Sequence, residues 1–234
     1  MSMTVKELAK RYPTASEYIS QIYLIIRDYG DCNNRRLAQF IGVSPSAVSQ
    51  AVSRLRKLGL TSQDLYGMIT LSEEGIVLAE QILKRHYLLE LLMVKELKYP
   101  WDLADKEAES LQDKISDQFL EHLFVMLGRP KTCPHGNPIP GSDTSDHILA
   151  AKKFNESSEG DEISIVRITE EGEREPGLLH FCYENHMMPA SIFTIKTITG
   201  ESLEVENATG AIITLPKSFA EHIRVCREYT TTKV

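Results

Sequence analysis

The segment between Leu37 and Leu58 constrains the fold of this chain more than any other. A short helical pattern of apolar residues stops there at Gly42, and a serine and a proline follow at positions that favour the start of a new helix. The segment therefore predicts a helix, a tight turn and a second helix over Pro45–Leu58. Apolar residues at three- and four-residue spacing predict an earlier helix over Ser16–Tyr29, closed by a glycine.

Two short strand-like runs follow these helices. They cover Leu60–Leu65 and Met68–Leu71, and the Tyr66–Gly67 pair between them predicts a hairpin turn. Three helices with such a hairpin form a winged helix-turn-helix. The alternative is a three-helix packing unit whose polar face is simply solvated.

The predicted helix Pro45–Leu58 separates its apolar and polar residues onto different faces. Small polar residues near its N-terminus would let the backbone approach a DNA major groove, and Gln50 has the donor and acceptor that pair with an adenine edge. Arginines on this helix and the one before it could neutralise phosphates. The predicted DNA-contacting residues are Arg35, Arg36, Ser44, Ser46, Ala47, Ser49, Gln50, Arg54 and Arg56.

The distribution of charge favours the same interpretation. The whole chain has a net charge of −7, but residues 1–60 hold nine Lys and Arg against four Asp and Glu, whereas the rest holds 17 against 29. A basic segment in an acidic protein fits contact with a polyanion such as double-stranded DNA. A chance fluctuation of charge is the alternative.

Long helical patterns follow the hairpin. One helix is predicted from its N-cap, Ser72, nearly to Tyr99, and two more over Ala104–Ile115 and Asp117–Leu127. Their apolar surface exceeds what one small domain buries, which predicts a homodimer. A dimer suits the reading of palindromic DNA.

The composition changes beyond Pro140. Polar linkers flank a short predicted helix over Ile148–Phe154, and a mostly β domain follows. Its predicted elements are strands over Ile163–Ile168, Ser191–Thr197, Leu203–Val205 and Ala211–Leu215 and a helix near Leu178–Tyr183. The predicted fold class is α+β, with a winged helix-turn-helix over 1–74, an α-helical dimerisation domain over 75–141, a linker over 142–160 and a small β domain over 161–234.

The sequence contains no sign of secretion or membrane insertion. Its first fifteen residues lack the continuous apolar segment of a signal peptide, and its longest apolar run is short and interrupted by Glu90. The four cysteines, Cys32, Cys133, Cys182 and Cys226, lie far apart without a Cys-x-x-Cys pair, which argues against a disulfide framework and a zinc ribbon. We therefore expect a cytoplasmic protein with reduced thiols and no membrane partner.

The Cys133-Pro134-His135 sequence is the strongest indication of a bound metal. Pro134 fixes the backbone between a thiol and an imidazole, on a loop rich in proline and glycine. These two ligands favour zinc, iron or copper, and added carboxylates make iron(II) or manganese(II) suitable as well. Two alternatives stay open: Cys133 is a small buried hydrophobe beside a hydrogen-bonded His135, or it is a nucleophile activated by a base. No third catalytic group is recognisable, so no enzyme activity is predicted.

Further candidate ligands lie on predicted helices. His86 and Glu90 are four residues apart, so their side chains share a helix face and can hold one ion. The others are Glu109, Gln112 and Asp113, spaced to share a face of the next helix, and Glu17 on the helix Ser16–Tyr29. Taken singly, each is more typical of a solvated or locally paired side chain.

Together these motifs resemble the DtxR/MntR family of metal-dependent transcriptional repressors, from about Tyr18 to the end of the chain. The matching pieces are EYISQIY (Glu17–Tyr23), VSPSAVSQ (Val43–Gln50), RHYLLELL (Arg85–Leu92) and CPHGNPIPG (Cys133–Gly141), of which the last two form a specific pairing. The closing portion, with LLHFCYENHMMPAS, is similar to the FeoA-like, SH3-like domain of this family. The resemblance implies that the domain 75–141 also binds metal.

The resemblance implies two metal sites. One would use Glu90, Cys133 and His135 as direct ligands with His86 nearby, and an acidic side chain of the C-terminal domain would close it. The candidates there are Glu170, Glu171, Glu173 and Glu175, and Glu170 is the one chosen. The second site would use Glu17, His86, Glu109, Gln112 and Asp113. Family members usually have Glu followed by His where this chain has Gln112 and Asp113, so this site loses an imidazole and gains a neutral amide.

The resemblance also implies the function. A divalent metal, manganese(II) or iron(II) with zinc(II) as the alternative, would activate a homodimer to bind a palindromic operator and repress genes of metal-ion homeostasis. One alternative is a winged-helix regulator that senses a small organic ligand, with the Cys-Pro-His loop purely structural. Another is a DNA-binding protein that a permanent zinc ion holds folded.

Overall fold

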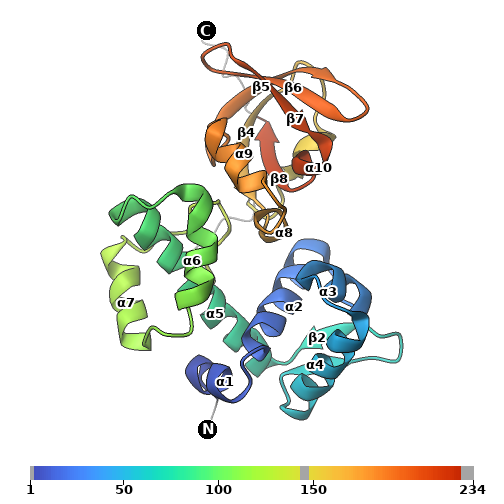
Figure 1. Cartoon of the computed structure of the whole chain (residues 1–234), viewed down its shortest axis with the longest axis vertical. Helices are drawn as coiled ribbons and strands as arrows, with labels where there is room; N and C mark the ends of the chain where they lie inside the picture. Colours follow the sequence, from blue (N-terminus) through green and yellow to red (C-terminus); the bar gives the residue numbers. More distant parts are fainter. Residues whose placement is uncertain (1–2, 143–147, 228–234) are drawn as a thin grey trace. The chain divides into compact units, whose positions relative to one another are not determined.

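The computed structural model of the chain describes residues 3–142 and 148–227, and Figure 1 traces its helices and strands. Residue contacts divide the chain into two compact units, one of residues 1–89 and 107–129 and the other of residues 90–106 and 130–234. The predicted linker 142–160 and the end of the predicted β domain include residues 143–147 and 228–234, which lie outside the described residues. The four predicted domain ranges remain predictions.

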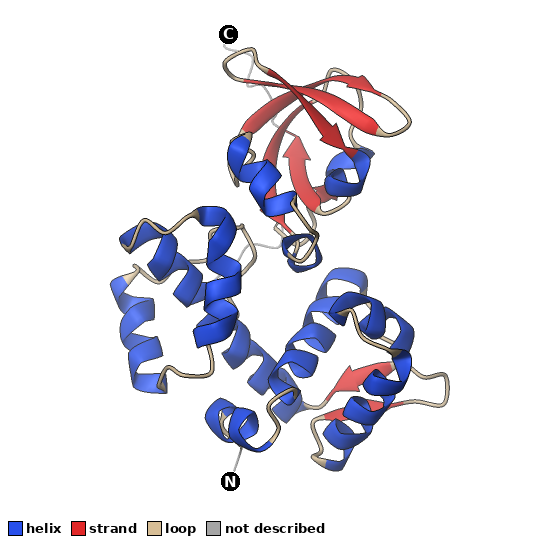
Figure 2. Cartoon of the chain, viewed as in Figure 1, coloured by secondary structure: helices blue, strands red, loops and turns tan. Residues whose placement is uncertain are grey.

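The first unit is helical apart from one small hairpin, within the described residues (Figure 2). Its elements are α1 (Val5–Arg11), α2 (Ala15–Tyr29), α3 (Asn34–Ile41), α4 (Pro45–Lys57), β1 (Thr61–Gln63), β2 (Ile69–Leu71), most of α5 (Glu73–Leu91), the end of α6 (Ala104–Leu111) and α7 (Asp117–Met126).

The predicted helix-turn-helix is confirmed, and its caps explain it. Helix α3 ends at Gly42, whose φ of 77° is the left-handed conformation that glycine adopts without strain. The Ser44 hydroxyl then accepts a hydrogen bond from the Ala47 backbone N–H at 3.2 Å, and Pro45 occupies the first helical position of α4. Helix α1 was not predicted. It begins with a capping box between Thr4 and Glu7.

The predicted hairpin is confirmed with shorter strands. Strands β1 and β2 pair antiparallel, with Thr61 opposite Leu71. The Asp64 carboxylate accepts hydrogen bonds from the backbone N–H groups of Tyr66 and Met68, at 2.9 and 2.8 Å, and so holds the turn between the strands. A three-helix core with this hairpin is a winged helix-turn-helix.

The long helix begins where the sequence predicts. The Ser72 hydroxyl accepts a hydrogen bond from the Gly75 backbone N–H at 3.1 Å, and α5 then runs to Leu91 and into a π-helical turn over Leu92–Glu96. Glu90 therefore lies at the C-terminal end of α5. Helix α7 also matches its prediction.

Helix α6 is shorter than predicted. It ends at Leu111, and the chain turns through Gln112 and Asp113 before Ser116 caps α7 by accepting a hydrogen bond from the Phe119 backbone N–H at 3.2 Å. A polar run just before a strong N-cap favours a turn over further helix. The predicted extension of this helix to Ile115 is therefore wrong, and Gln112 and Asp113 lie in the turn that follows it.

The second unit contains an antiparallel sheet of six described strands in the order β3-β8-β4-β5-β6-β7. The strands are β3 (Lys152–Lys153), β4 (Glu162–Ile168), β5 (Ile192–Ile198), β6 (Ser202–Asn207), β7 (Ile212–Pro216) and β8 (Ile223–Arg227). Short helices join them: α8 (Glu170–Glu173) and α9 (Leu178–Glu184) between β4 and β5, and α10 (Lys217–Ala220) between β7 and β8. A 3₁₀ turn at Phe154–Glu156 follows β3, and another at Trp101–Leu103 precedes α6. The predicted small β domain is confirmed, and so is the α+β fold class.

Two predictions in this unit fail at the edge of the sheet. The helix predicted over Ile148–Phe154 is wrong, because Lys152 and Lys153 form β3 and pair with Val225 and Arg224 of β8. Strand β8 was itself missed, although it lies between β3 and β4 in the sheet. Both segments are strands because they pair with residues distant in the sequence. The spacing of apolar residues within a segment does not reveal such a partner.

Candidate metal centre

The Cys133–Asn137 loop is a compact turn closed by its own backbone. The Cys133 N–H donates to the Asn137 carbonyl at 2.8 Å, and the Gly136 N–H donates to the Cys133 carbonyl at 3.0 Å. Gly136 has a φ of 91°, and a Cβ there would lie 2.2 Å from the Val166 carbonyl oxygen. Only glycine fits this close approach to β4, so the loop is fixed against the sheet.

Trp101 holds the loop in two ways. Its indole N–H donates to the Pro134 carbonyl at 3.0 Å, and its own carbonyl oxygen lies 3.1 Å from His135 Nε2. Because a carbonyl can only accept, Nε2 carries a hydrogen. The other ring nitrogen, Nδ1, faces Glu90. The Trp101 and His135 rings also meet edge to face, with centroids 4.5 Å apart.

Three different ligand types converge in the second unit. A carboxylate oxygen of Glu90, the Cys133 sulfur and a His135 ring nitrogen all lie within 4.8 Å of one another. The three residues are at most 3% exposed. His135 Nδ1 is 3.2 Å from Glu90 Oε1, a contact that is a hydrogen bond only when Nδ1 is protonated.

Two further acids border this cluster. Glu173 of α8 places Oε1 3.6 Å from His135 Nδ1. Carboxylate oxygens of Glu90, Asp105 and Glu173 also lie within 4.8 Å of one another. Glu170, the residue chosen from the sequence, is buried at 6% exposure, but Glu173 is the acid of α8 that contacts His135 and belongs to this group.

The buried, acidic surroundings raise the pKa values of Cys133, Glu173 and His135. Burial raises the pKa of the Cys133 thiol well above its ordinary value, and the nearby Glu90, Glu173 and Glu170 carboxylates raise it further. Burial and then Glu170, Glu90 and Asp105 likewise raise the pKa of Glu173 well above its ordinary value. Burial opposes a charged imidazolium, but the Glu90 carboxylate beside it raises the pKa of His135 overall.

These residues fit a divalent cation. Carboxylates, a thiol sulfur and an imidazole lone pair all donate electron pairs. When such groups are buried together, either shared protons or a bound cation must offset their mutual repulsion. A thiolate, an imidazole and carboxylates are ligands for iron(II), manganese(II) and zinc(II). Their arrangement can hold an ion among buried side chains, two of which lie on the loop that Trp101 holds in place.

The second predicted cluster does not converge in the same way. Its members are Glu17 in α2, half-buried; His86 in α5, buried; Glu109 in α6, exposed; and Gln112 and Asp113 in the turn after α6, half-buried. Within residues 3–142 and 148–227, no group of three close metal-ligating side chains includes Glu17, Glu109 or Asp113.

The predicted DNA-contacting residues lie on and around α4. Arg35, Ser44, Ser46, Ser49, Gln50, Arg54 and Arg56 are exposed, and Ala47 is half-buried. The Ser49 hydroxyl donates to the Pro45 carbonyl at 3.0 Å and accepts from the Asn34 amide at 3.1 Å, so it ties α3 to α4. Arg36 is engaged within the protein, because it pairs with Asp31 and stacks over the Tyr29 ring.

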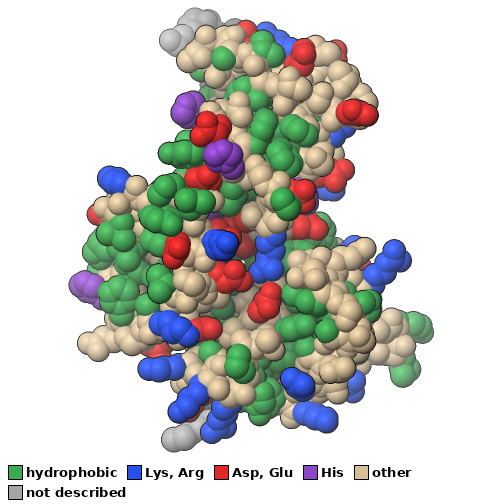
Figure 3. All heavy atoms as spheres, viewed as in Figure 1, with side chains coloured by type: hydrophobic (Ala, Val, Ile, Leu, Met, Phe, Trp, Pro, Cys, Tyr) green, Lys and Arg blue, Asp and Glu red, His purple; other side chains and the backbone are tan. Residues whose placement is uncertain are grey.

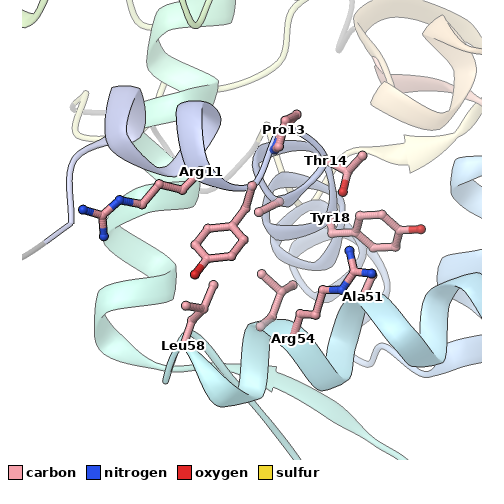
Figure 4. A pocket seen from close by; sticks show the side chains of 10 residues that line it. Arg11, Pro13, Thr14, Tyr18, Ala51, Arg54 and Leu58 are labelled. Carbon is pink, nitrogen blue, oxygen red and sulfur yellow. The ribbon is translucent and has the colours of Figure 1, made fainter.

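A small cavity lies beside α4. It has a volume of about 110 Å³, and Tyr18, Ala51, Arg54 and Leu58 are among the residues around it (Figure 4). Small-molecule sites usually measure about 300–1,000 Å³, so this cavity is too small for a typical organic effector.

Helix α7 presents an apolar surface. Phe119, Val125 and Met126 are 42, 55 and 46% exposed, and hydrophobic side chains gather over this helix in Figure 3. Exposed apolar patches of this kind mark interaction sites in proteins. No helix within the described residues is long and apolar enough to cross a membrane.

Two family profiles match consecutive parts of the chain. "Iron dependent repressor, N-terminal DNA binding domain" matches residues 12–67, and "Iron dependent repressor, metal binding and dimerisation domain" matches residues 72–141. The chain belongs to the DtxR family of metal-dependent repressors. It is a metal-dependent DNA-binding transcriptional repressor and is not an enzyme.

Individual relatives agree with this membership in the DtxR family. The chain is 26% identical to the iron-dependent repressor IdeR of Mycobacterium tuberculosis, over 91% of this chain and 96% of that protein. It is 33% identical to an uncharacterised HTH-type transcriptional regulator of Methanocaldococcus jannaschii, over 49% of this chain and 93% of that protein. A solved manganese-dependent transcriptional repressor in complex with manganese matches with a TM-score of 0.78 and 28% identity, over 92% of this chain and 100% of that one.

Sequence reasoning missed three residues that surround the cluster in this DtxR-family chain. Trp101 is the single tryptophan and follows a proline, which is the signal that could have singled it out. Asn137 lies two residues after His135, within the motif, but its amide has no obvious role until its partners are known. Asp105 cannot be told from the solvated acids of α6 without the fold.

Proposed function

We propose that this repressor responds to manganese(II) or iron(II) through Glu90, Cys133, His135 and Glu173. The supporting observation is the convergence of carboxylate, thiol and imidazole within 4.8 Å on buried side chains. The two carboxylates make the set harder than the thiolate and imidazole alone, which is why we place manganese and iron before zinc. Glu173 replaces Glu170 in this proposal because of its contact with His135.

The residues of the site provide the switch. Carboxyl groups of Glu90, Glu170 and Glu173 lie close enough to raise the pKa of the Cys133 thiol, so their ionised forms repel one another. A bound divalent ion would supply the positive charge that lets these ligands stay deprotonated side by side. Glu90 lies at the end of α5, and α5 begins directly after the β1–β2 hairpin of the winged helix-turn-helix. An ion bound to Glu90 would therefore restrain the helix that follows the DNA-binding domain.

We further propose a homodimer on a palindromic operator of metal-homeostasis genes. The exposed apolar residues of α7 supply a surface for self-association. Two recognition helices must then reach major-groove faces about 34 Å apart, or a multiple of that spacing. A shift from 1:99 to 99:1 in the competent population needs about 5.5 kcal/mol of differential binding, which is less than the roughly 10–16 kcal/mol of a structural zinc site.

One titration tests the proposal. The affinity of the full chain for a palindromic operator fragment is measured with manganese(II), iron(II), zinc(II) or a chelator. We expect manganese or iron to raise the affinity and the chelator to abolish the increase. Equal operator binding by the metal-stripped and metal-loaded protein would contradict it. Two variants of α4 serve as controls. Gln50→Ala should reduce discrimination between base sequences, whereas Arg54→Ala should weaken binding to all DNA sequences and reduce the salt dependence of binding.

A further inference from the structure

The Asn137 side chain is fully buried and uses both ends of its amide. Its Nδ2 donates to the Ile168 carbonyl at 2.8 Å and to Glu173 Oε1 at 2.6 Å. Its Oδ1 accepts from Arg167 Nη1 at 2.9 Å. An amide has two N–H donors, and both are used here. Asn137 therefore links the Cys-Pro-His loop to β4 and to the acid of α8 that contacts His135.

The orientation of this amide is determined by its neighbours. A guanidinium only donates and a backbone carbonyl only accepts, so Oδ1 must face Arg167 and Nδ2 must face Ile168. The amide N–H that remains can point only to Glu173. Reversing the amide would place its oxygen against two acceptors and its N–H₂ against a cation.

Arg167 is itself locked in place. It is 2% exposed and follows a β-bulge in β4, where the register with β8 shifts between Ile165 and Arg167. The Ile168 N–H donates to the His135 carbonyl at 2.9 Å, so the loop and β4 are joined on both sides of the Asn137 side chain. Two hydrogen bonds between buried side chains therefore connect Arg167 to Asn137 and Asn137 to Glu173.

We propose that Asn137 is a positioning residue that holds the Glu173 carboxylate at the metal cluster, and that Arg167 sets the orientation of its amide. Carboxylate oxygens of Glu90 and Asp105 lie within 4.8 Å of a Glu173 oxygen, so these groups repel one another when they are ionised. The Asn137 N–H donates to Glu173 Oε1 and offsets this repulsion on that oxygen, and the carboxylate keeps further lone pairs for an ion. This inference rests on the proposed function, because it assigns a support to one of the proposed ligands.

Asn137→Asp is the direct test, since it preserves the shape and the acceptor for Arg167 but removes both N–H donors. We expect the manganese(II) and zinc(II) affinities of the full chain, measured by competition with a fluorescent chelator, to fall about 10–100-fold, as for other residues that orient metal ligands. Asn137→Ser removes the same donors without adding charge and should weaken binding in the same direction. It keeps the test informative if the aspartate variant fails to fold.

A double-mutant cycle separates positioning from general support of the fold. If Asn137 acts through Glu173, the loss caused by Asn137→Asp should shrink to within about twofold in a Glu173→Gln background. A residue that only stabilises the loop would lower affinity by the same factor in both backgrounds. Ser142→Ala is the matched control, because its hydroxyl donates to the Ile139 carbonyl just after the loop at 2.6 Å, so it should leave affinity unchanged.

The outcomes are distinguishable. Unchanged metal affinity in both Asn137 variants, or an equal loss with and without Glu173→Gln, overturns the positioning role. Two other results would contradict the proposed function itself. One is operator binding by the wild-type protein that does not depend on metal, and the other is unchanged metal affinity in the Glu90→Gln and Cys133→Ser variants. The melting temperature of each variant in chelator reports whether the metal-free fold is intact.

Discussion

The two predicted metal clusters of this repressor differ in what holds their ligands. In the first, Glu90, Cys133 and His135 converge within 4.8 Å, and a closed loop, Trp101 and Gly136 hold Cys133 and His135 in place. In the second, Glu17, Glu109 and Asp113 belong to separate helices and a turn, and none of them joins a compact group within the described residues. A site is preorganised by the hydrogen bonds around its ligands more than by their spacing in the sequence.

The charges around the clusters differ as well. The first is surrounded by acids, which is why the pKa values of Cys133 and Glu173 are raised beyond the effect of burial. The second contains cations already. Lys6, Lys10 and Lys114 line the same surface depression as Asp113. The positive charge of Arg85 also attracts the Asp113 carboxylate. Positive protein charge near Asp113 lowers the gain from a bound divalent ion.

The largest expected effect is that of Glu90→Gln. Removing this carboxylate from the first cluster should weaken manganese binding by about 100-fold or more, beyond the 10–100-fold typical of residues that only support a ligand. The same change removes a buried acid but also the carboxylate that lies 3.2 Å from His135 Nδ1, so the stability of the metal-free protein should change by no more than about 1 kcal/mol. Calorimetric titration with manganese(II) and a melting curve in chelator measure the two effects.

The contrast between a large loss of metal affinity and a small change in stability sharpens the assignment. A Glu90 that served only the fold would lose stability in chelator when changed to Gln, and metal affinity would follow from unfolding. Glu80→Gln is a control on the same helix, because Glu80 accepts a hydrogen bond from the Tyr23 hydroxyl at 3.2 Å and is not a predicted ligand. It should leave metal affinity unchanged.

The pH dependence should have the next largest effect. The pKa values of Cys133, His135 and Glu173 are all raised above their ordinary values of 9.0, 6.5 and 4.5. Groups with raised folded-state pKa values stabilise the metal-free fold at low pH, and this contribution is lost as pH rises through them. Metal must displace the same protons, so its affinity rises with pH.

We therefore expect the melting-temperature gain on adding manganese(II) to increase from about pH 6 to about pH 8. Titrations in buffers of different ionisation enthalpy should show protons released on binding. A gain that stays constant across this range, with no proton release, would mean that the first cluster is not where the ion binds. The Cys133→Ser variant should release fewer protons than wild type.

Most of the winged helix-turn-helix could be predicted from the sequence because the residues that determine its helix ends act locally. Gly42, Ser44 and Pro45 act on their immediate neighbours, so caps and helix limits follow from order along the chain. Cys133, His135 and Glu90 were predicted as ligands from their chemistry and from the resemblance to a known family. Their contact needs a fold that brings residues 90, 133 and 135 together.

What could not be predicted depends on long-range partners. Glu173 and Glu170 are three residues apart on the same acidic run, and only the contact of Glu173 with Asn137 and His135 separates them. Strand β8 and the clamp by Trp101 likewise depend on partners distant in the sequence. Helix α6 was predicted too long because the spacing of acids also fits a turn before a new N-cap.

The smallest expected effect is that of Asp113→Asn, which tests the second cluster. This residue is half-buried, and its carboxylate already interacts with Lys114 and Arg85. A partly exposed charge contributes less than about 1 kcal/mol, so manganese affinity and the metal concentration at half-maximal operator binding should change within about threefold. Because Glu90→Gln should act at least tenfold more strongly in the same assays, the ratio of the two effects decides between the clusters. Equal losses would show that both clusters regulate, and a larger loss for Asp113→Asn would move the regulatory site to the turn after α6.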